Sequence, residues 1–551
     1  MALLSMTACK TNIFLQEWNT PYGTAPFSKI KEADYLPAFR AGLKEQDTNV
    51  AAIVACPDAP TFENTILALE NASPILDKVE GVFFNLSESD STPEMQAIEE
   101  EILPELTAAS NEIYMNEALF ARVKAVYDNQ EGLTREQQMV VKKIYQSFER
   151  NGVGLQGEAK ARFAEINTRL SSLSQKFGQN LLAENNAFKD ATGITVSDYY
   201  DFMGSCPDRE KRKEVFEAYR SRGNHGDGND NCAIVLEILK LRAEMAELLG
   251  YKNFAEFQLS DKMAGSPETV DAFLQPIMDA SMRKARADMK EMEAIAGHKI
   301  EAWDYSYYAE KLRAQKYALD ESLTKPYFQA DSVLKGVFAA ARMVYGINIE
   351  PAPEVEVYNL AASAYKLTDK DGSLLGIFYR DYYVRPTKRG GAWMNNFRDQ
   401  YKMPGQAGHD VGVGHDVTPD LIGGVKDIRP VIVNVCNFPA PTDTLPSLLT
   451  VDNVQTAFHE FGHALHGFLT QCNYKTVSGT SVARDFVETF SQFNENFAFV
   501  PEILAQYAHD YRTGEPIPAE LVDKVRSGLK FNQGFMCGEL CAASILDMKW
   551  H

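Results

Sequence analysis

The chain has 551 residues with a formal net charge of −21, and hydrophobic residues make up 45% of it. This length and composition are those of a globular protein that buries more than one core. The acidic balance argues against nucleic acid or an anionic membrane surface as partner, because both bind a basic face. Eight cysteines lie without regular spacing, which indicates free thiols and excludes a disulfide scaffold.

The N-terminus carries a short apolar stretch, MALLSMTACK, with small residues and Cys9 at its end. It is similar to the tail of a bacterial lipoprotein signal, although it lacks a basic start and a full-length apolar region. We interpret residues 1–9 either as a remnant of such a signal, which places the protein in the cell envelope or periplasm, or as a short disordered end of a cytoplasmic protein. No run of about 18 apolar residues predicts a transmembrane helix.

From residue 28 to about 350 the pattern predicts helices almost throughout. Segments such as TFENTILALENASPILDKVEGVFFNL place apolar residues at spacings of three and four, with charges between them. Thr61 and Thr134 precede early acidic residues, as helix N-caps do. We expect an N-terminal helical lobe over residues 10–150 and a catalytic region over residues 151–551.

After about residue 354 the pattern changes to β-strands. The segment VEVYNLAASAYKLTDKDGSLLGIFYRDYYVR alternates β-branched and aromatic residues around the turn former DKDG and predicts a hairpin. The segment GGAWM is a candidate edge strand for an extended peptide, and residues 429–438 form a further strand. Residues 403–427 include His409 and His415, and we interpret them as a glycine-rich loop, with a second metal site as the alternative.

The stretch TAFHEFGHALHGF, residues 456–468, contains an H-E-x-x-H motif. On a helix, His459 and His463 lie one turn apart on one face and reach one ion, while Glu460 acts as general base on the water that it activates. His466 lies roughly 10 Å along the axis from His459, too far to share that ion. The extended pattern H-E-x-x-H-x-x-G-x-x-H would need glycine at 466 and histidine at 469, where the chain has His466 and Leu469. We therefore expect the third ligand elsewhere in the sequence, with a carboxylate as the usual choice and an open position left for water.

The next segment, SVARDFVETFSQFNENFAF, predicts a helix with Asp485, Glu488, Gln492 and Glu495 on one stripe. A charged stripe alone is typical of a solvent-facing surface. After an H-E-x-x-H helix, Glu488 is within reach as the third ligand. Asp485, one turn earlier, is the candidate acceptor for a histidine N–H, and both Asp485 and Glu495 remain alternatives to Glu488 as ligand.

With these motifs the sequence resembles the thimet oligopeptidase and peptidyl-dipeptidase family of zinc metallopeptidases. The resemblance rests on FHEFGHALHG, SGTSVARDFVE, KRGGAWMNNF, RPVIVNVCNF and PSLLT, and it begins near the N-terminus with APTFENTILALE. It implies a mostly α, two-lobed fold with a deep central channel and a small β-sheet beside the zinc helix. It also implies one zinc ion per chain, with Glu488 at the family's third-ligand spacing.

The resemblance further implies hydrolysis of short unfolded peptides by a monomer. The wording of SGTSVARDFVE and AASILDMKWH is closer to bacterial peptidyl-dipeptidases, which release C-terminal dipeptides, than to endo-acting oligopeptidases. The family usually has proline at the position of Phe490. Family members also continue beyond the match to His551, with a histidine and tyrosines that stabilise the oxyanion. A catalytically weak peptide-binding protein is therefore a further alternative.

Overall fold

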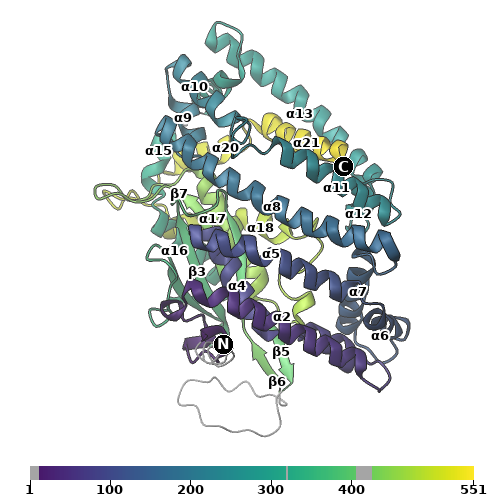
Figure 1. The fold of residues 1–551 in the computed structure, drawn as a ribbon. Coiled ribbons are helices and arrows are strands. Elements are labelled where there is room, and N and C mark those ends of the chain that lie inside the picture. The colour runs from purple at the N-terminus through teal and green to yellow at the C-terminus, as the bar shows by residue number, and fades with distance from the viewer. Residues whose placement is uncertain (1–11, 318–320, 405–424) are drawn as a thin grey trace.

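The computed structural model describes residues 12–317, 321–404 and 425–551. The predictions for residues 1–9 and for His409 and His415 therefore lie outside the described residues. The part of the chain that is described is mostly helical with a small sheet (Figure 1), as the sequence predicts.

Helices account for nearly all of the chain as far as residue 345. The longer ones are α2 (Glu32–Ala55), α4 (Pro74–Ser89), α5 (Pro93–Tyr114), α6 (Glu117–Asp128), α7 (Arg135–Arg150), α8 (Gly157–Thr192), α10 (Arg209–Arg220), α11 (Cys232–Leu248), α13 (Pro267–Ala296), α14 (Tyr305–Tyr317) and α16 (Ala330–Tyr345). The shorter ones are α3 (Ala68–Glu70), α9 (Tyr199–Ser205), α12 (Phe254–Leu259) and α15 (Glu321–Thr324). The boundary expected at residue 150 falls in the turn between α7 and α8, and α8 packs against α5 across it.

The expected helix starts at Thr61 and Thr134 are present. The Thr61 hydroxyl accepts a hydrogen bond from the backbone N–H of Asn64, and the Thr134 hydroxyl accepts one from Gln137. In both cases the third helical residue returns a side-chain bond to the capping backbone. Each box pairs two of the N–H groups that a helix start leaves without partners.

The strands follow and form a mixed sheet. They are β1 (Asn348–Pro351), β2 (Ser363–Thr368), β3 (Leu374–Tyr383), β4 (Trp393–Arg398) and β7 (Val431–Phe438) in the order β1-β2-β3-β7-β4, with β5 (Tyr401–Pro404) and β6 (Val425–Ile428) as a separate pair. The predicted hairpin is β2 and β3, and its turn contains Gly372 at φ 88°. Strands β3 and β7 are parallel, whereas β4 is antiparallel to β7.

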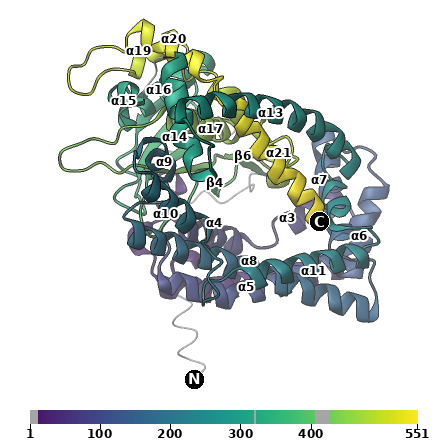
Figure 2. The same cartoon turned by 90° about the horizontal axis from the view of Figure 1, so that it is seen from above.

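The last part of the chain returns to helices. These are α17 (Val451–Phe468), α18 (Glu488–Glu495), α19 (Pro501–Tyr507), α20 (Ala519–Gly528) and α21 (Gln533–Trp550). The helix predicted over 481–499 is therefore shorter than expected and begins at Glu488. Figure 2 shows α5, α8 and α11 along one side of the molecule and α13 with α21 along the opposite side.

The sheet divides two hydrophobic cores. Alternate residues of β7, such as Ile432 and Cys436, pack with α16 and α17 on one face, while Val433 and Val435 pack with α2, α4 and α5 on the other. A strand buried on both faces reads as a continuous apolar run, as VIVNVCNF does. The face of the sheet that carries Ile432 and Cys436 therefore supports α17.

Strand β4 is an edge of the sheet, as expected for the segment that begins at GGAWM. Half of its outer side is covered by α4, because Asn85 Nδ2 donates to Asn396 O and Gly81 lies against Phe397 O. The covered part includes Asn396 and Phe397, which leaves the beginning of the strand, Trp393–Asn395, as the candidate pairing edge.

Candidate metal centre

Helix α17 carries the H-E-x-x-H motif on a well-capped start. The Thr450 hydroxyl accepts from Asn453 N, and the Asn453 side chain accepts from Thr450 N. His459 and His463 lie one turn apart, with ring centroids separated by 5.0 Å. Their Nε2 atoms lie 3.2 and 3.0 Å from the same oxygen, Oε2 of Glu488.

Glu488 is the first residue of α18, which packs directly on α17. The contact is close because Gly462 has no side chain, and a Cβ there would lie 2.6 Å from Cα of Ser491. Asn494 Nδ2 also donates to the carbonyl of Phe458 over 2.6 Å. These contacts fix the start of α18 opposite the two histidines and bring Glu488, the residue predicted as third ligand, next to both.

Glu495, the last residue of α18 and about two turns beyond Glu488, contacts the first histidine. Its Oε1 is 2.7 Å from His459 Nδ1. Because a carboxylate only accepts, Nδ1 is the nitrogen that donates to Glu495, and Nε2 would be the ligand atom if a cation took the place of its contact with Glu488. This is the role that the sequence analysis gave to Asp485.

The prediction for Asp485 as histidine partner is wrong. Its carboxylate accepts the backbone N–H groups of Met263 and Ala264, over 3.1 and 2.9 Å, and it precedes α18. The sequence signal for Glu495 was its position seven residues after Glu488, on the same helical stripe. His466 is not one of the three residues whose ligand atoms converge, and its ring lies 4.7 Å from that of Phe490.

Glu460 differs from Glu488 in its surroundings. Its residue is 5% exposed, whereas the Glu488 side chain is 50% exposed. Burial raises the pKa of Glu460 to about 7, and the charge of Glu488 adds to the rise while His459 opposes it. A buried carboxylate with a pKa near neutrality is suited to accept and return a proton.

The pKa values of the ligand candidates follow from the same contacts. Burial lowers the pKa of His463. For His459, burial also acts downward, but the bond to Glu495 and the neighbouring carboxylates leave its pKa raised. The pKa of Glu488 is lowered, because Ser491 and the two histidines outweigh burial.

These three side chains suit a cation. One ligand atom from each lies within 4.8 Å of the other two, and two imidazole nitrogens with one carboxylate oxygen are a common donor set for a divalent transition metal. His459, His463 and Glu488 form the group of this kind found among the described residues. An ion that they share would take the place of the present histidine–carboxylate contacts.

The loop between α17 and α18 is held by the N-terminal helix α7. Lys143 Nζ donates to the carbonyls of Thr476 and Ser481, over 3.0 and 2.5 Å. Glu136 accepts from Asn473 N. The position of Glu488 relative to the histidines thus depends on residues more than 300 positions earlier in the chain.

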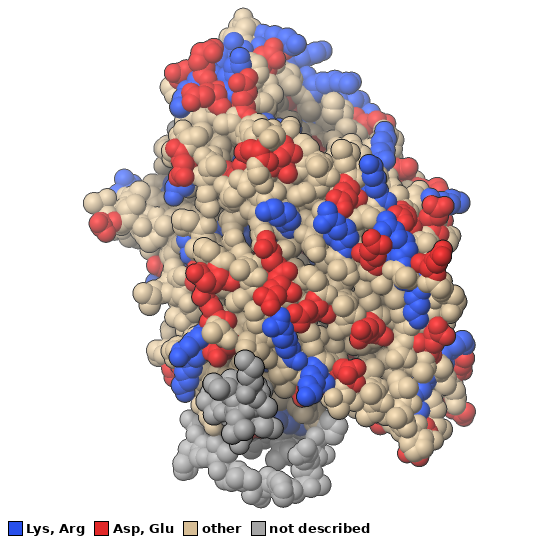
Figure 3. Space-filling model, viewed as in Figure 1, with Lys and Arg blue, Asp and Glu red and all other residues tan. Residues whose placement is uncertain are grey.

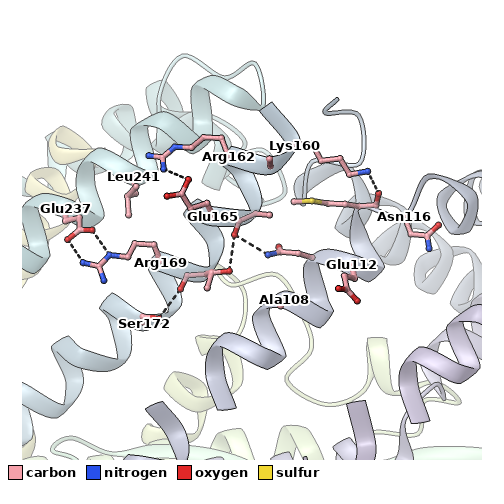
Figure 4. A pocket seen from close by; sticks show the side chains of 15 residues that line it. Ala108, Glu112, Asn116, Lys160, Arg162, Glu165, Arg169, Ser172, Glu237 and Leu241 are labelled. Carbon is pink, nitrogen blue, oxygen red and sulfur yellow. Dashed lines mark hydrogen bonds and ion pairs between the residues drawn. The ribbon is translucent and has the colours of Figure 1, made fainter. Parts of the chain in front are cut away.

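A pocket lies elsewhere, between α5, α8 and α11 (Figure 4), with a volume of about 910 Å³. None of the metal-centre residues lines it. Its arginines are already paired, Arg162 with Glu165 and Glu244, and Arg169 with Glu237. The histidine cluster is the better candidate site, because ligand atoms of three side chains converge on one point there.

Comparison with known families agrees with this geometry, since residues 202–551 match the profile of peptidase family M3. The chain belongs to peptidase family M3. It is a metallopeptidase, and the resemblance found in its motifs is confirmed.

Relatives within the M3 family extend over nearly the whole chain. A dipeptidyl carboxypeptidase from Salmonella typhimurium is 35% identical, over 98% of this chain and 82% of its own length. Oligopeptidase A from Escherichia coli is 30% identical, over 97% of this chain and 82% of its own length. A solved structure described as "a putative oligoendopeptidase F" from Bacillus anthracis aligns with a TM-score of 0.51 at 16% identity, covering 90% of this chain and 74% of that one, and so shares the fold.

The surface agrees with the mixed composition of the chain. On the face shown in Figure 3, lysine and arginine are interspersed with aspartate and glutamate. Among the described residues, no helix is both long and apolar enough to cross a membrane.

Proposed function

We propose that this M3 peptidase hydrolyses short peptides by releasing C-terminal dipeptides, with one zinc ion held by His459, His463 and Glu488. The observation that carries the proposal is the convergence of both Nε2 atoms on Glu488 Oε2, next to the buried Glu460. When bound, zinc would supply Lewis acidity that activates water and polarises the scissile carbonyl. The dipeptide specificity is supported by the 35% identity with a dipeptidyl carboxypeptidase.

Glu460, Glu495 and the start of β4 have different roles in this proposal. Glu460 takes the proton of the attacking water and passes it to the leaving amine. Glu495 holds His459 in the tautomer whose Nε2 is free to bind a cation. The uncovered start of β4, Trp393–Asn395, offers backbone groups to an extended peptide.

An endo-acting oligopeptidase with the same chemistry is the second candidate, because oligopeptidase A is 30% identical over nearly the whole chain. The two differ in their need for a free C-terminal carboxylate. A dipeptide-releasing enzyme binds that carboxylate, which fixes the scissile bond two residues from the C-terminus, whereas an endopeptidase does not need it.

Mass spectrometry of a short peptide with a free or an amidated C-terminus tests the proposal. The zinc-loaded protein is expected to remove dipeptides stepwise from the free form and to leave the amide intact. Glu460→Gln, loaded in the same way, serves as the control for contaminating peptidases. Internal cleavage of both forms would establish the oligopeptidase instead, and absence of cleavage with zinc bound would refute both.

A further inference from the structure

Several buried polar atoms beneath α17 have no hydrogen-bond partner among the described residues. Among them are both amide atoms of Asn434, the hydroxyl of Tyr382, Nε of Arg380 and Oε2 of Glu460. Asn434 and Tyr382 are 0% exposed. Roughly 90% or more of buried polar groups in proteins are paired with protein or ordered water, so a cluster of unpaired ones in one place calls for a ligand.

The packing of α17 brings these atoms to one region. Helix α17 runs opposite to β3 and β7: a Cβ on Gly376 would lie 2.7 Å from Phe468 Cε1, whereas the ring of Phe461, earlier on the helix, lies 5.3 Å from that of Phe378, further along β3. A Cβ on Gly467 would lie 2.4 Å from Ile432 Cδ1, which places the end of α17 over the start of β7. Seven helical residues from Gly467 back to Glu460 span roughly 10 Å. The four strand residues from Ile432 to Cys436 span roughly 13 Å. Asn434 therefore lies beneath the turns that carry the motif.

Side-chain direction supports the same placement. Ile432 and Cys436 face α17, and Asn434 between them alternates to the same face. Arg380 is the cross-strand partner of Asn434, and its guanidinium lies 4.9 Å from the Tyr382 ring centre. The amide and the phenol thus lie on neighbouring strands under the same helix.

Glu460 is close to this group as well. Burial is the main reason that the pKa values of Cys436 and Tyr382 lie well above the usual range, and the charge of Glu460 raises both further. Glu460 also lies seven residues, about two turns, before Gly467 and therefore on the same face of α17 as that glycine, which packs on β7. Its unpaired Oε2 is buried.

We propose that Asn434 and Tyr382 bind ordered water beneath α17 and that this water hydrogen-bonds Oε2 of Glu460, so that both are positioning residues for the general base. The donors and acceptors match. The Tyr382 hydroxyl and Asn434 Nδ2 donate to the water oxygen, and the water donates to Glu460 Oε2 and Asn434 Oδ1. The other carboxylate oxygen stays free for the proton of the attacking water. The catalytic part of this inference rests on the proposed function.

Tyr382→Phe removes one oxygen and keeps the packing. We expect kcat to fall about 10- to 100-fold, as for other groups that orient catalytic residues. KM and bound zinc per chain should stay unchanged. Tyr379→Phe is the matched control: Tyr379 is equally buried on β3 but faces the other core, where its hydroxyl donates to Glu356 O. Its loss should leave kcat unchanged.

A high-resolution crystal structure of the metal-free protein supplies a readout that does not depend on turnover. Density for water within hydrogen-bond distance of Tyr382 Oη and Glu460 Oε2, absent or displaced in Tyr382→Phe, is expected. No such density in the unmodified protein would overturn the proposal. If Tyr382→Phe does not fold, Asn434→Val replaces it with the same expectations.

The kinetic outcomes are equally decisive. An unchanged kcat in Tyr382→Phe, or a fall in kcat matched by an equal loss of zinc, would overturn the positioning role. If the unmodified protein cleaves no peptide, the proposed function fails, and the density alone then decides whether the water site exists.

Discussion

Glu460 is buried whereas the Glu488 side chain is half-exposed, and we expect the two carboxylates to have different roles. Glu460→Gln keeps the size of the buried side chain but removes the proton acceptor. We expect bound zinc per chain to be unchanged and kcat to fall by about 10²–10⁴, the range for general-base removal. Elemental analysis and peptide hydrolysis on the same sample measure both. Retained activity would contradict the general-base role.

Glu488→Ala removes the oxygen on which both imidazoles converge. Zinc per chain measured by elemental analysis after dialysis is expected to fall, because two histidines alone make an incomplete site. His466→Ala is the control on the same helix, since its ring lies beside Phe490, and zinc content should not change. Full zinc occupancy in Glu488→Ala would move the third ligand to another carboxylate.

Glu495→Gln tests the carboxylate that contacts His459 in the structure, where the sequence had predicted Asp485. Zinc affinity, measured by competition with a chelating dye, is expected to weaken about 10- to 100-fold, because His459 loses the charge that fixes its tautomer. Asp485→Asn is the matched comparison and should leave the affinity unchanged, since Asp485 holds the backbone of Met263 and Ala264. Equal effects of the two changes would refute the distinction.

The sequence predicted which candidate ligands lie together better than it predicted the residues that contact them. His459 and His463 follow from helical spacing alone, which is a local property. The partner of His459 depends on how two helices are rotated against each other, and several acids on one stripe satisfy the same spacing. Contacts of Asp485 with residues 222 and 221 positions away could not be inferred from local pattern.

At the scale of elements, the contact between α17 and α18 sets the geometry of the site. Gly462→Ala is expected to destabilise the protein and weaken zinc binding, because the added Cβ meets the α18 backbone at 2.6 Å and forces the helices apart. Thermal unfolding and chelator competition measure the two effects.

Gly178→Ala is the control for the helix propensity of alanine. Gly178 lies within α8, where an added Cβ meets nothing within 4 Å. Alanine there should raise the free energy of unfolding by up to about 1 kcal/mol and leave zinc affinity unchanged. A stabilising effect of Gly462→Ala would mean that the two helices are less tightly packed than their backbones indicate.

Secondary-structure elements that depend on residues adjacent in sequence were predicted well, whereas a boundary that depends on long-range contacts was not. The β2–β3 hairpin was predicted because its turn residues and alternating strands are adjacent in sequence. The start of α18 was placed about seven residues too early, since apolar spacing continues through SVARDFV. Long-range bonds to Ser481 and Asp485 hold that segment outside the helix, and periodicity does not register them.

At the scale of the whole molecule, a buried ion-pair cluster joins the N-terminal helices to the sheet. Asp381 on β3 receives hydrogen bonds from Arg385 and Lys388, and Arg385 also contacts Asp90 at the end of α4. Burial opposes ionisation of Asp381, but these two cations outweigh it and its pKa lies below the ordinary value.

Because the folded state binds this proton less readily than the unfolded chain, the stabilisation is fully present above about pH 4 and is lost as the pH falls through the folded-state pKa. Asp381→Asn should lower the free energy of unfolding by about 3–5 kcal/mol at pH 7, since it leaves buried cations unpaired. The difference should shrink below pH 4 in urea titrations. Asp128→Asn, in an exposed pair with Lys124, should change it by less than about 1 kcal/mol.

The bonds from α7 to the loop before α18 also bear on the order of assembly. Lys143 and its partner Ser481 are 338 residues apart, so this contact closes only after most of the chain has been synthesised and collapsed. Helices depend on local contacts and form quickly, so we expect the N-terminal helices to form before their contacts with this loop. Affinity for the ion should therefore arise at the end of refolding, and a metal indicator followed after dilution from urea should lag behind the return of helical circular dichroism.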